Sequence, residues 1–492
     1  MNNHIKLNFL SIYLIFSFGS VKTLAIGPTN EKNHFPIEEG RNTIQLKHDA
    51  SSFLYCTEAL TVEGNLKIVG GNNMECKGNF ELVWDINVPT NGVYELYLIA
   101  NVREKGKNAE VLFKTIGGNS TFKLNPTEGP YQGGRNFQRI KLTSDISLIK
   151  GPQTVSFSTH KISHEDILLD FRSIELVPTL AKKKIEKEMQ RAINSRESVD
   201  WLVESGYGLM FHWTSESVQK DGTIKSYEEA VNEFDVMKFT DMVEETGAGY
   251  VIFTIGHAES YCPAPIKSWE IRHPGKTTKR DLIAEMSDAL NKKGIKLICY
   301  INGPLAFKLD VQKEKLTKDE QQDFVTNFQD ILKEMGGRYK HKVAGYWFDS
   351  WYQIFEKFPD VPFEQFNKAT KVGNRDRIIC LNSWIYPSVT PWQDYWAGEV
   401  ASPIDIPANG YMKNGPVPDL PYQALLIMEP YWVQETSVMP KPRFDSSSLT
   451  KYIQDCNRNS GAVTINLGIY QDGTVGNEAL EIMKEVKRNI RE

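Results

Sequence analysis

The sequence predicts an α/β protein in which a (β/α)8 TIM-like barrel is preceded by an all-β sandwich. Residues 43–178 form short runs that alternate apolar and polar side chains, whereas residues 200–492 alternate continuous apolar runs with amphipathic helices. The chain has 492 residues, of which 40% are hydrophobic and 24% charged. That composition excludes a disordered, collagen-like or coiled-coil protein, and the length suffices for two domains.

The first 25 residues have the pattern of a secretory signal peptide. Lys6 precedes an apolar run over residues 7–18, and a small-residue segment ends at Ala25. No later stretch reaches the ~18 consecutive apolar residues of a transmembrane helix, so we expect no membrane insertion. The sequence therefore predicts an exported protein, either periplasmic or secreted.

The net charge bears on the class of partner, and the cysteine spacing bears on metal sites and disulfides. A formal net charge of −5 disfavours nucleic acid. The six cysteines show neither a CxxC pair nor metal-ligand spacing. Cys56 and Cys76 are either bridged, as an oxidising compartment would allow, or two buried free thiols. The oligomeric state is not predicted.

The predicted sandwich occupies residues 43–178. Period-two runs separated by Gly, Pro and Asn cover residues 80–88, 94–99, 155–158 and 167–177. Residues 179–199 change to a helical period rich in Lys and Glu, which predicts a connecting helix between the two domains.

The predicted barrel occupies residues 200–492. Its helices include residues 236–246 and 280–293, where apolar side chains recur at helical spacing. A repeated β-then-α order over nearly 300 residues predicts a parallel barrel. The strand-like apolar runs are residues 207–212, 250–257, 295–300, 344–349, 378–382, 424–429 and 463–467.

Polar residues end several of these runs, and strand ends build the site in such a barrel. Asp349 closes the aromatic run over 344–349, where a carboxylate is costly unless it lies at a site or caps a helix. Glycosidic cleavage needs two carboxyl groups, one ionised and one protonated. The candidates for the second are Glu399 in an aromatic loop, Glu429 after the run over 424–429, and, more weakly, Glu259.

Histidines and aromatics share these strand ends. His212 and His257 end adjacent predicted strands and could bind sugar hydroxyls, ligate a metal or be core residues; no HxH or HExxH spacing supports a metal. Aromatic rings suit stacking on sugar faces, although most tryptophans pack in cores. The aromatic candidates for substrate binding are Trp213, Tyr300, Trp347, Trp384 and Trp432.

Five segments together resemble the α-L-fucosidases of glycoside hydrolase family 29. YGLMFHW at 207–213 is similar to that family's FGxFxHWG, and the YWFD that ends at Asp349 is similar to its WFDG. The other segments are GYVIFTIGH at 249–257, the stretch from RDL to GIKLICY over 280–300, and NLG with DGT within 466–474. The sandwich resembles the carbohydrate-binding modules attached to such enzymes.

The resemblance implies a retaining exo-α-glycosidase that hydrolyses a terminal L-fucose or related sugar from complex glycans without a cofactor. It implies that Asp349 is the nucleophile, that Glu399 is the acid/base with Glu429 as the alternative, and that His212 and His257 contact the sugar. The family's second histidine is Ala258 here, which implies an altered sugar subsite. Two alternatives stay open: a catalytically silent glycan-binding protein, and a barrel enzyme with a metal at the two histidines.

Overall fold

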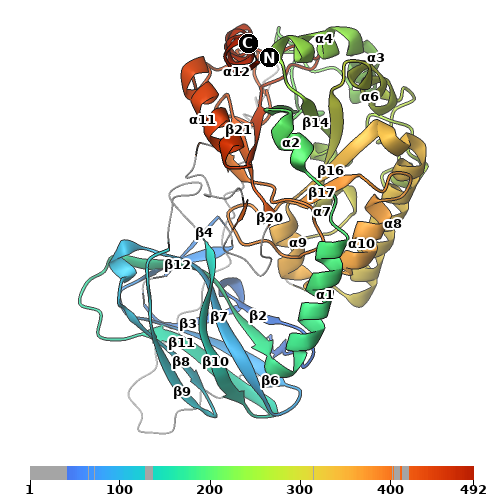
Figure 1. Cartoon of the computed structure of the whole chain (residues 1–492). Coiled ribbons are helices and arrows are strands. Elements are labelled where there is room, and N and C mark those ends of the chain that lie inside the picture. The colour runs from blue at the N-terminus through green and yellow to red at the C-terminus, as the bar shows by residue number, and fades with distance from the viewer. Residues whose placement is uncertain are drawn as a thin grey trace, which may run out of the picture. The chain divides into compact units, whose positions relative to one another are not determined.

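The structure is a computed structural model that describes residues 42–64, 66–70, 72–127, 137–313, 315–401, 403, 411–412 and 420–491. The predicted signal peptide, residues 1–25, lies outside them. The chain divides into two compact units, the first ending at Glu186 and the second starting at Lys187 (Figure 1). Among the described residues, no helix has the length and apolar character needed to cross a membrane.

The first unit is a sandwich of two six-stranded sheets (Figure 1). Alternate residues of each strand, among them Trp84, Phe157 and Phe171, meet in one buried core. Cys56 and Cys76 are both buried and are not joined by a disulfide, which is the unbridged alternative of the two that the sequence left open. One sheet holds β1 (Ile44–Gln45), β3 (Leu60–Glu63), β6 (Phe80–Val88), β8 (Glu110–Thr115), β9 (Gly118–Lys123) and β11 (Gly151–Thr159); the other holds β2 (Ser52–Tyr55), β4 (Lys67–Val69), β5 (Asn73–Lys77), β7 (Gly92–Val102), β10 (Gln138–Leu148) and β12 (Ile167–Pro178).

The helix expected over residues 179–199 is shorter than predicted. A single 3-10 turn at Thr179–Ala181 leads into α1 (Lys182–Asn194), and α2 (Asp200–Glu204) precedes the first strand of the second unit.

The second unit is built on a curled sheet of eight parallel strands (Figure 1). Their order is β17-β16-β15-β14-β13-β22-β21-β18, the order of a (β/α)8 barrel, but no pairing joins β17 to β18. The (β/α)8-type barrel expected from the sequence is therefore found in part: its eight parallel strands are present, and among the described residues one seam, between β17 and β18, is open. The strands are β13 (Gly208–Phe211), β14 (Tyr250–Gly256), β15 (Lys296–Asn302), β16 (Val343–Asp349), β17 (Ile378–Leu381), β18 (Glu399–Ala401), β21 (Gln423–Ile427) and β22 (Ala462–Asn466); β19 (Tyr411–Met412) and β20 (Leu420–Pro421) pair separately.

The helices cover the outside of the sheet. The α4 helix starts at the N-cap Asp235, whose side chain accepts the N–H of Lys238 at 3.0 Å, and it ends at Gly247, which has a φ of +76°. Its Phe239 and Val243 are buried in the core between the sheet and the helices. The helices are α3 (Tyr227–Glu233), α4 (Val236–Thr246), α5 (Lys267–Arg272), α6 (Leu282–Lys292), α7 (Gly303–Ala306), α8 (Lys318–Tyr339), α9 (Trp351–Lys357), α10 (Phe363–Thr370), α11 (Ser446–Arg458) and α12 (Asn477–Arg491).

Side chains replace a neighbouring strand along the open edge of β17. Asp394 accepts the N–H of Ile379 at 2.6 Å and donates its own N–H to the carbonyl of Ile379 at 2.9 Å; Gln393 accepts the N–H of Leu381 at 3.1 Å. A buried strand edge cannot leave its donors unpaired. The segment 382–398 therefore fills the seam and leads the chain into Glu399.

We expect Asp394→Ala to destabilise the second unit by about 3 kcal/mol, since its buried carboxylate also accepts the N–H of Glu197 at 2.8 Å and lies 3.3 Å from the Lys371 ammonium. Denaturant unfolding followed by tryptophan fluorescence measures the loss. Asp288→Ala is the matched control, because Asp288 pairs with Lys342 at the surface. An unchanged unfolding midpoint in the Asp394 variant would contradict the seam's dependence on this carboxylate.

Candidate active site

The carboxyl ends of the parallel strands bring one cluster of polar and aromatic side chains together. His212 follows β13, His257 follows β14, Tyr300 lies near the end of β15, and Asp349 ends β16. The rings of His212 and Tyr300 lie 4.9 Å apart, and Tyr300 donates its hydroxyl to Asp349. Four of the predicted site residues therefore share one end of the barrel.

Asp349 is held by three donors. Its Oδ2 accepts the Tyr300 hydroxyl at 2.6 Å, and its Oδ1 accepts the backbone N–H of Ser350 and the side-chain amide of Asn382, each at 2.7 Å. Ser350 adopts a φ of +63°, an uncommon conformation for serine, at the point where the chain turns from β16 into α9. This donor set fixes the orientation of the carboxylate.

Glu399 lies beside Asp349 across the seam. The Nδ2 of Asn382 donates to Glu399 Oε2 at 2.5 Å and to Asp349 Oδ1 at 2.7 Å. These two carboxyl oxygens are therefore at most about 5.2 Å apart, the sum of the two distances. Gly398 permits this placement, because it has a φ of +59° and a Cβ there would lie 1.5 Å from the carbonyl oxygen of Gln423.

The surroundings of Glu399 keep a proton on this carboxyl group beside Asp349. Burial, reinforced by the negative charge of Asp349, raises the pKa of Glu399 to about 8, although the hydrogen bond from Asn382 opposes the rise. Glu399 therefore carries a proton at neutral pH. A proton donor placed beside a carboxylate is the division that glycosidic cleavage requires.

The two histidines are neutral and close to each other, with ring centroids 5.9 Å apart. Burial and the neighbouring His257 lower the pKa of His212 to about 4, and burial lowers that of His257. Asn466 donates its amide to the carbonyl of Trp432, so its Oδ1 faces His212 Nδ1 at 2.7 Å. His212 therefore donates from Nδ1 and keeps Nε2 as an acceptor, while His257 Nδ1 is buried without a partner among the described residues.

The predicted aromatics occupy different depths. Trp432 packs its ring 5.1 Å from His212. Trp347 is buried inside the barrel and stacks under Tyr300 at 5.2 Å, so it supports the cluster from below. Trp384 is half-buried and donates its backbone N–H to Asn382 Oδ1 at 2.9 Å.

Two predicted contact residues lie outside the cluster. Trp213 is fully buried against Tyr227 and Phe253, with its indole N–H bonded to the carbonyl of Gln471 at 3.0 Å. Trp213 belongs to the buried cluster between the sheet and its helices, which also holds Phe239 of α4. Glu259 is exposed, with an ammonium partner, Lys276, at 3.5 Å.

Glu429, the alternative acid/base, lies two residues beyond β21. Its Oε2 accepts the N–H of Gly468 at 2.8 Å, and its Oε1 has no partner among the described residues. Burial raises the pKa of Glu429 to about 7. No described hydrogen bond connects Glu429 to Asp349, whereas Glu399 reaches it through one shared atom.

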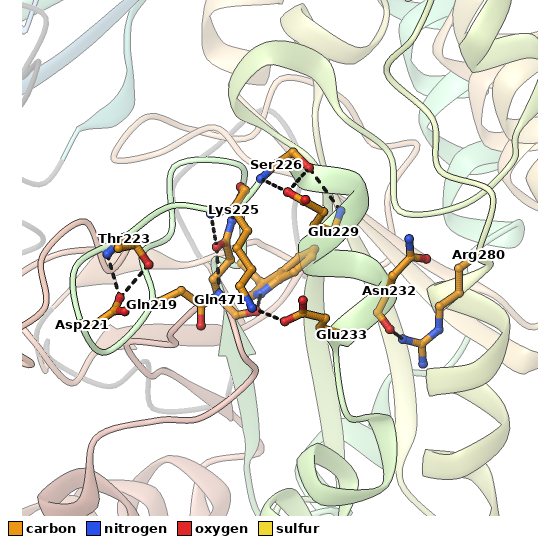
Figure 2. Close-up of polar contacts among 11 residues, drawn as sticks. Gln219, Asp221, Thr223, Lys225, Ser226, Glu229, Asn232, Glu233, Arg280 and Gln471 are labelled. Atoms are coloured by element: carbon orange, nitrogen blue, oxygen red, sulfur yellow. Dashed lines mark hydrogen bonds and ion pairs between the residues drawn. The ribbon is translucent and has the colours of Figure 1, made fainter.

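The first and last strand-to-helix loops are clamped together near this end of the barrel. Figure 2 shows the buried Gln471 side chain, whose Oε1 accepts the Gln219 amide at 3.0 Å and the N–H of Lys225 at 2.9 Å. Its Nε2 donates to the carbonyl of Lys225 at 2.9 Å. A capping box between Ser226 and Glu229 then starts α3. The clamp fixes the loop that follows His212.

Sequence reasoning missed Asn382 and Asn466, which orient the predicted residues. Both end apolar strands, which is the signal that singled out Asp349, so the same rule could have found them. Within the described ranges, no group of three or more His, Cys, Asp or Glu side chains gathers closely enough to hold a metal ion.

The comparisons with known proteins identify the family. The family model described as Alpha-L-fucosidase matches residues 225–490, more than half of the chain. An α-L-fucosidase from Bacteroides thetaiotaomicron is 18% identical, with a TM-score of 0.47, over 60% of this chain and 73% of that one. An α-L-fucosidase from Lactobacillus casei, solved with its α-L-fucose product, is 17% identical, with a TM-score of 0.42, over 60% and 98%. No curated protein matches the chain. The family match stands independently of these two distant structures, and the chain is a glycoside hydrolase that belongs to the α-L-fucosidase family.

Proposed function

We propose that the protein is an exported retaining exo-α-glycosidase that removes a terminal L-fucose, or a closely related sugar, from complex glycans. The family match supports the glycosidase class and a glycan substrate. The proposed export, to the periplasm or outside the cell, is supported by the signal-like pattern of residues 1–25.

The distance between the two carboxyl groups is the observation that supports a retaining mechanism. Retaining glycosidases hold them about 5 to 5.5 Å apart, whereas inverting enzymes need about 6.5 to 9.5 Å for an intervening water. The oxygens of Asp349 and Glu399 that share the Asn382 nitrogen lie at most about 5.2 Å apart, which favours double displacement.

In the first step, an oxygen of Asp349 forms a bond to the anomeric carbon while Glu399 gives its proton to the departing glycosidic oxygen. In the second step, the ionised Glu399 takes a proton from water, and the water oxygen displaces Asp349 from the sugar. Oδ2 is the better attacking atom, because Oδ1 accepts two hydrogen bonds and Oδ2 accepts one.

The remaining residues supply sugar contacts in this proposal. His212 Nε2 and His257 Nδ1 are available for hydroxyl groups. Trp432 offers an aromatic face beside His212. Trp384, whose backbone N–H bonds to Asn382 and whose ring lies 5.7 Å from that of Tyr386, is the second aromatic candidate. The single histidine before Ala258 provides fewer hydroxyl contacts than a histidine pair, which permits a sugar other than L-fucose.

Hydrolysis of a panel of aryl α- and β-glycosides, headed by α-L-fucoside and α-L-galactoside, tests the proposal. Proton NMR of the first product gives its anomeric configuration, and retention is expected. An inverted product would overturn the double displacement. Absence of turnover on the panel and on fucosylated oligosaccharides, together with retained sugar binding, would establish the silent glycan-binding alternative.

The pH dependence should show its basic limb near pH 8. Glu399 must be protonated to donate to the leaving group, and its pKa is raised to about 8, so activity falls as pH rises through that value. The pH profile of kcat/KM on a substrate with a sugar leaving group measures this limb. A fall near pH 5 would mean that the donor is an ordinary exposed carboxyl group.

A further inference from the structure

We propose that Asn382 is the positioning residue of the reaction, in that its one amide nitrogen sets the distance between the nucleophile and the acid/base and bonds to both. The inference rests on the proposed function for the roles of the two carboxyl groups. The contacts themselves are independent of it: Nδ2 lies 2.7 Å from Asp349 Oδ1 and 2.5 Å from Glu399 Oε2.

The fold leaves the Asn382 side chain no other orientation. Its backbone N–H donates to the carbonyl of Phe348 at 2.7 Å, and its carbonyl accepts the N–H of Trp351 at 3.0 Å. Its Oδ1 accepts the N–H of Trp384, a residue held at a φ of +53°. Because the amide oxygen is occupied there and the residue is fully buried, the amide hydrogens face the carboxyl groups.

A carboxamide suits this place chemically. Glu399 must carry a proton in the first step and lose it in the second, so its neighbour should serve both states. A cation in this position would favour the ionised form and remove the proton needed for the first step. A hydroxyl has one hydrogen and can serve one carboxyl group at a time. The neutral amide has two hydrogens and does not titrate.

Titratable groups face the pair from four strands. Asp349 on β16 faces Glu399 directly, and Tyr300 on β15 faces both carboxyl groups. His257 after β14 and His212 after β13 face Asp349. Because these neighbouring groups are unchanged in an Asn382 variant, removal of the Asn382 donor should raise the pKa of Glu399 further.

A first experiment needs no substrate. In the folded protein Glu399 keeps its proton up to about pH 8, and in the unfolded chain up to about pH 4.5. The free energy of unfolding that Glu399 adds, relative to Glu399→Gln, is therefore largest below pH 4.5 and declines as pH rises. Above the folded pKa this free-energy difference no longer changes with pH. We expect the constant region to begin about one pH unit higher in Asn382→Ala, measured as melting temperature against pH with and without Glu399→Gln. An unchanged onset would overturn the proposal.

The second experiment is the pH profile of kcat/KM. The basic limb should move upward by about one pH unit in Asn382→Ala, with a loss of activity on the order of 100-fold. The isosteric Asn382→Asp keeps the volume and removes the two-hydrogen donor, so it should also lose activity. Asn374→Ala, which removes a buried amide bonded to the carbonyl of Val343, should leave the basic limb in place.

The outcomes separate the two proposals. Activity loss without a shift of the basic limb would reduce Asn382 to a packing role. If the natural enzyme hydrolyses no glycoside, the proposed function fails, and the melting experiment still decides whether Asn382 controls the carboxyl pair.

Discussion

Asp349→Asn is expected to lose at least about 10⁴-fold in turnover of the best aryl α-glycoside while keeping its fold and its sugar binding. An amide oxygen is a poor nucleophile and cannot form the covalent ester with the anomeric carbon. The substitution is nearly isosteric, so the Asn382 and Ser350 donors stay in place around it.

Three measurements on the Asp349 variant are needed. Turnover is compared with that of the natural chain, melting temperature reports the fold, and titration with the product sugar reports binding. Asp288→Asn is the matched control, because that carboxylate forms only a surface ion pair with Lys342. Equal turnover in the Asp349 variant and the natural chain would remove Asp349 from the reaction.

The sequence predicted seven of the eight barrel strands, because long apolar runs are a strong signal. It missed β18, the strand that begins at Glu399. Three residues are too few to establish a period, and the segment 382–398 before it uses side-chain hydrogen bonds in place of a ladder. The open seam could not be predicted from the sequence either, because hydrophobic periodicity identifies the strands but not which strand edges pair.

The candidate site residues were predicted from strand ends and from the family resemblance. Asp349 and His212 lie at the carboxyl ends of their strands. Trp213 instead packs in the helix-side core against Tyr227. Glu259 follows its strand too late and lies at the surface beside Lys276. Which of several glutamates lies near Asp349 is a question of tertiary distance that spacing along the chain cannot answer.

The protonation of the site follows from the short distance between the carboxyl groups of Asp349 and Glu399. Two ionised carboxylates a few ångströms apart repel each other strongly when buried, so one retains its proton. Glu399 is the one that does, because burial and the charge of Asp349 raise its pKa. The protonated Glu399 is what the proposed acid role requires, and the three hydrogen bonds that Asp349 accepts hold its carboxylate in place for the proposed attack.

The loss of kcat/KM in Glu399→Ala should depend on how readily the leaving group of the substrate departs. For a substrate with a sugar leaving group, we expect kcat/KM to fall on the order of 10³-fold, because the departing oxygen no longer receives a proton. A glycosyl fluoride needs little protonation, so its first step should proceed at close to the natural rate. The basic limb near pH 8 should vanish with the group that causes it.

Glu429→Ala is the comparison that makes this prediction decisive. Glu429 is buried and has a pKa raised to about 7, so on electrostatic grounds alone it could also donate a proton. It differs in position, because its described bond goes to the N–H of Gly468 and not to a partner of Asp349. We therefore expect Glu429→Ala to affect sugar and fluoride leaving groups alike. Leaving-group selectivity in the Glu429 variant, with none in the Glu399 variant, would transfer the acid/base role to Glu429.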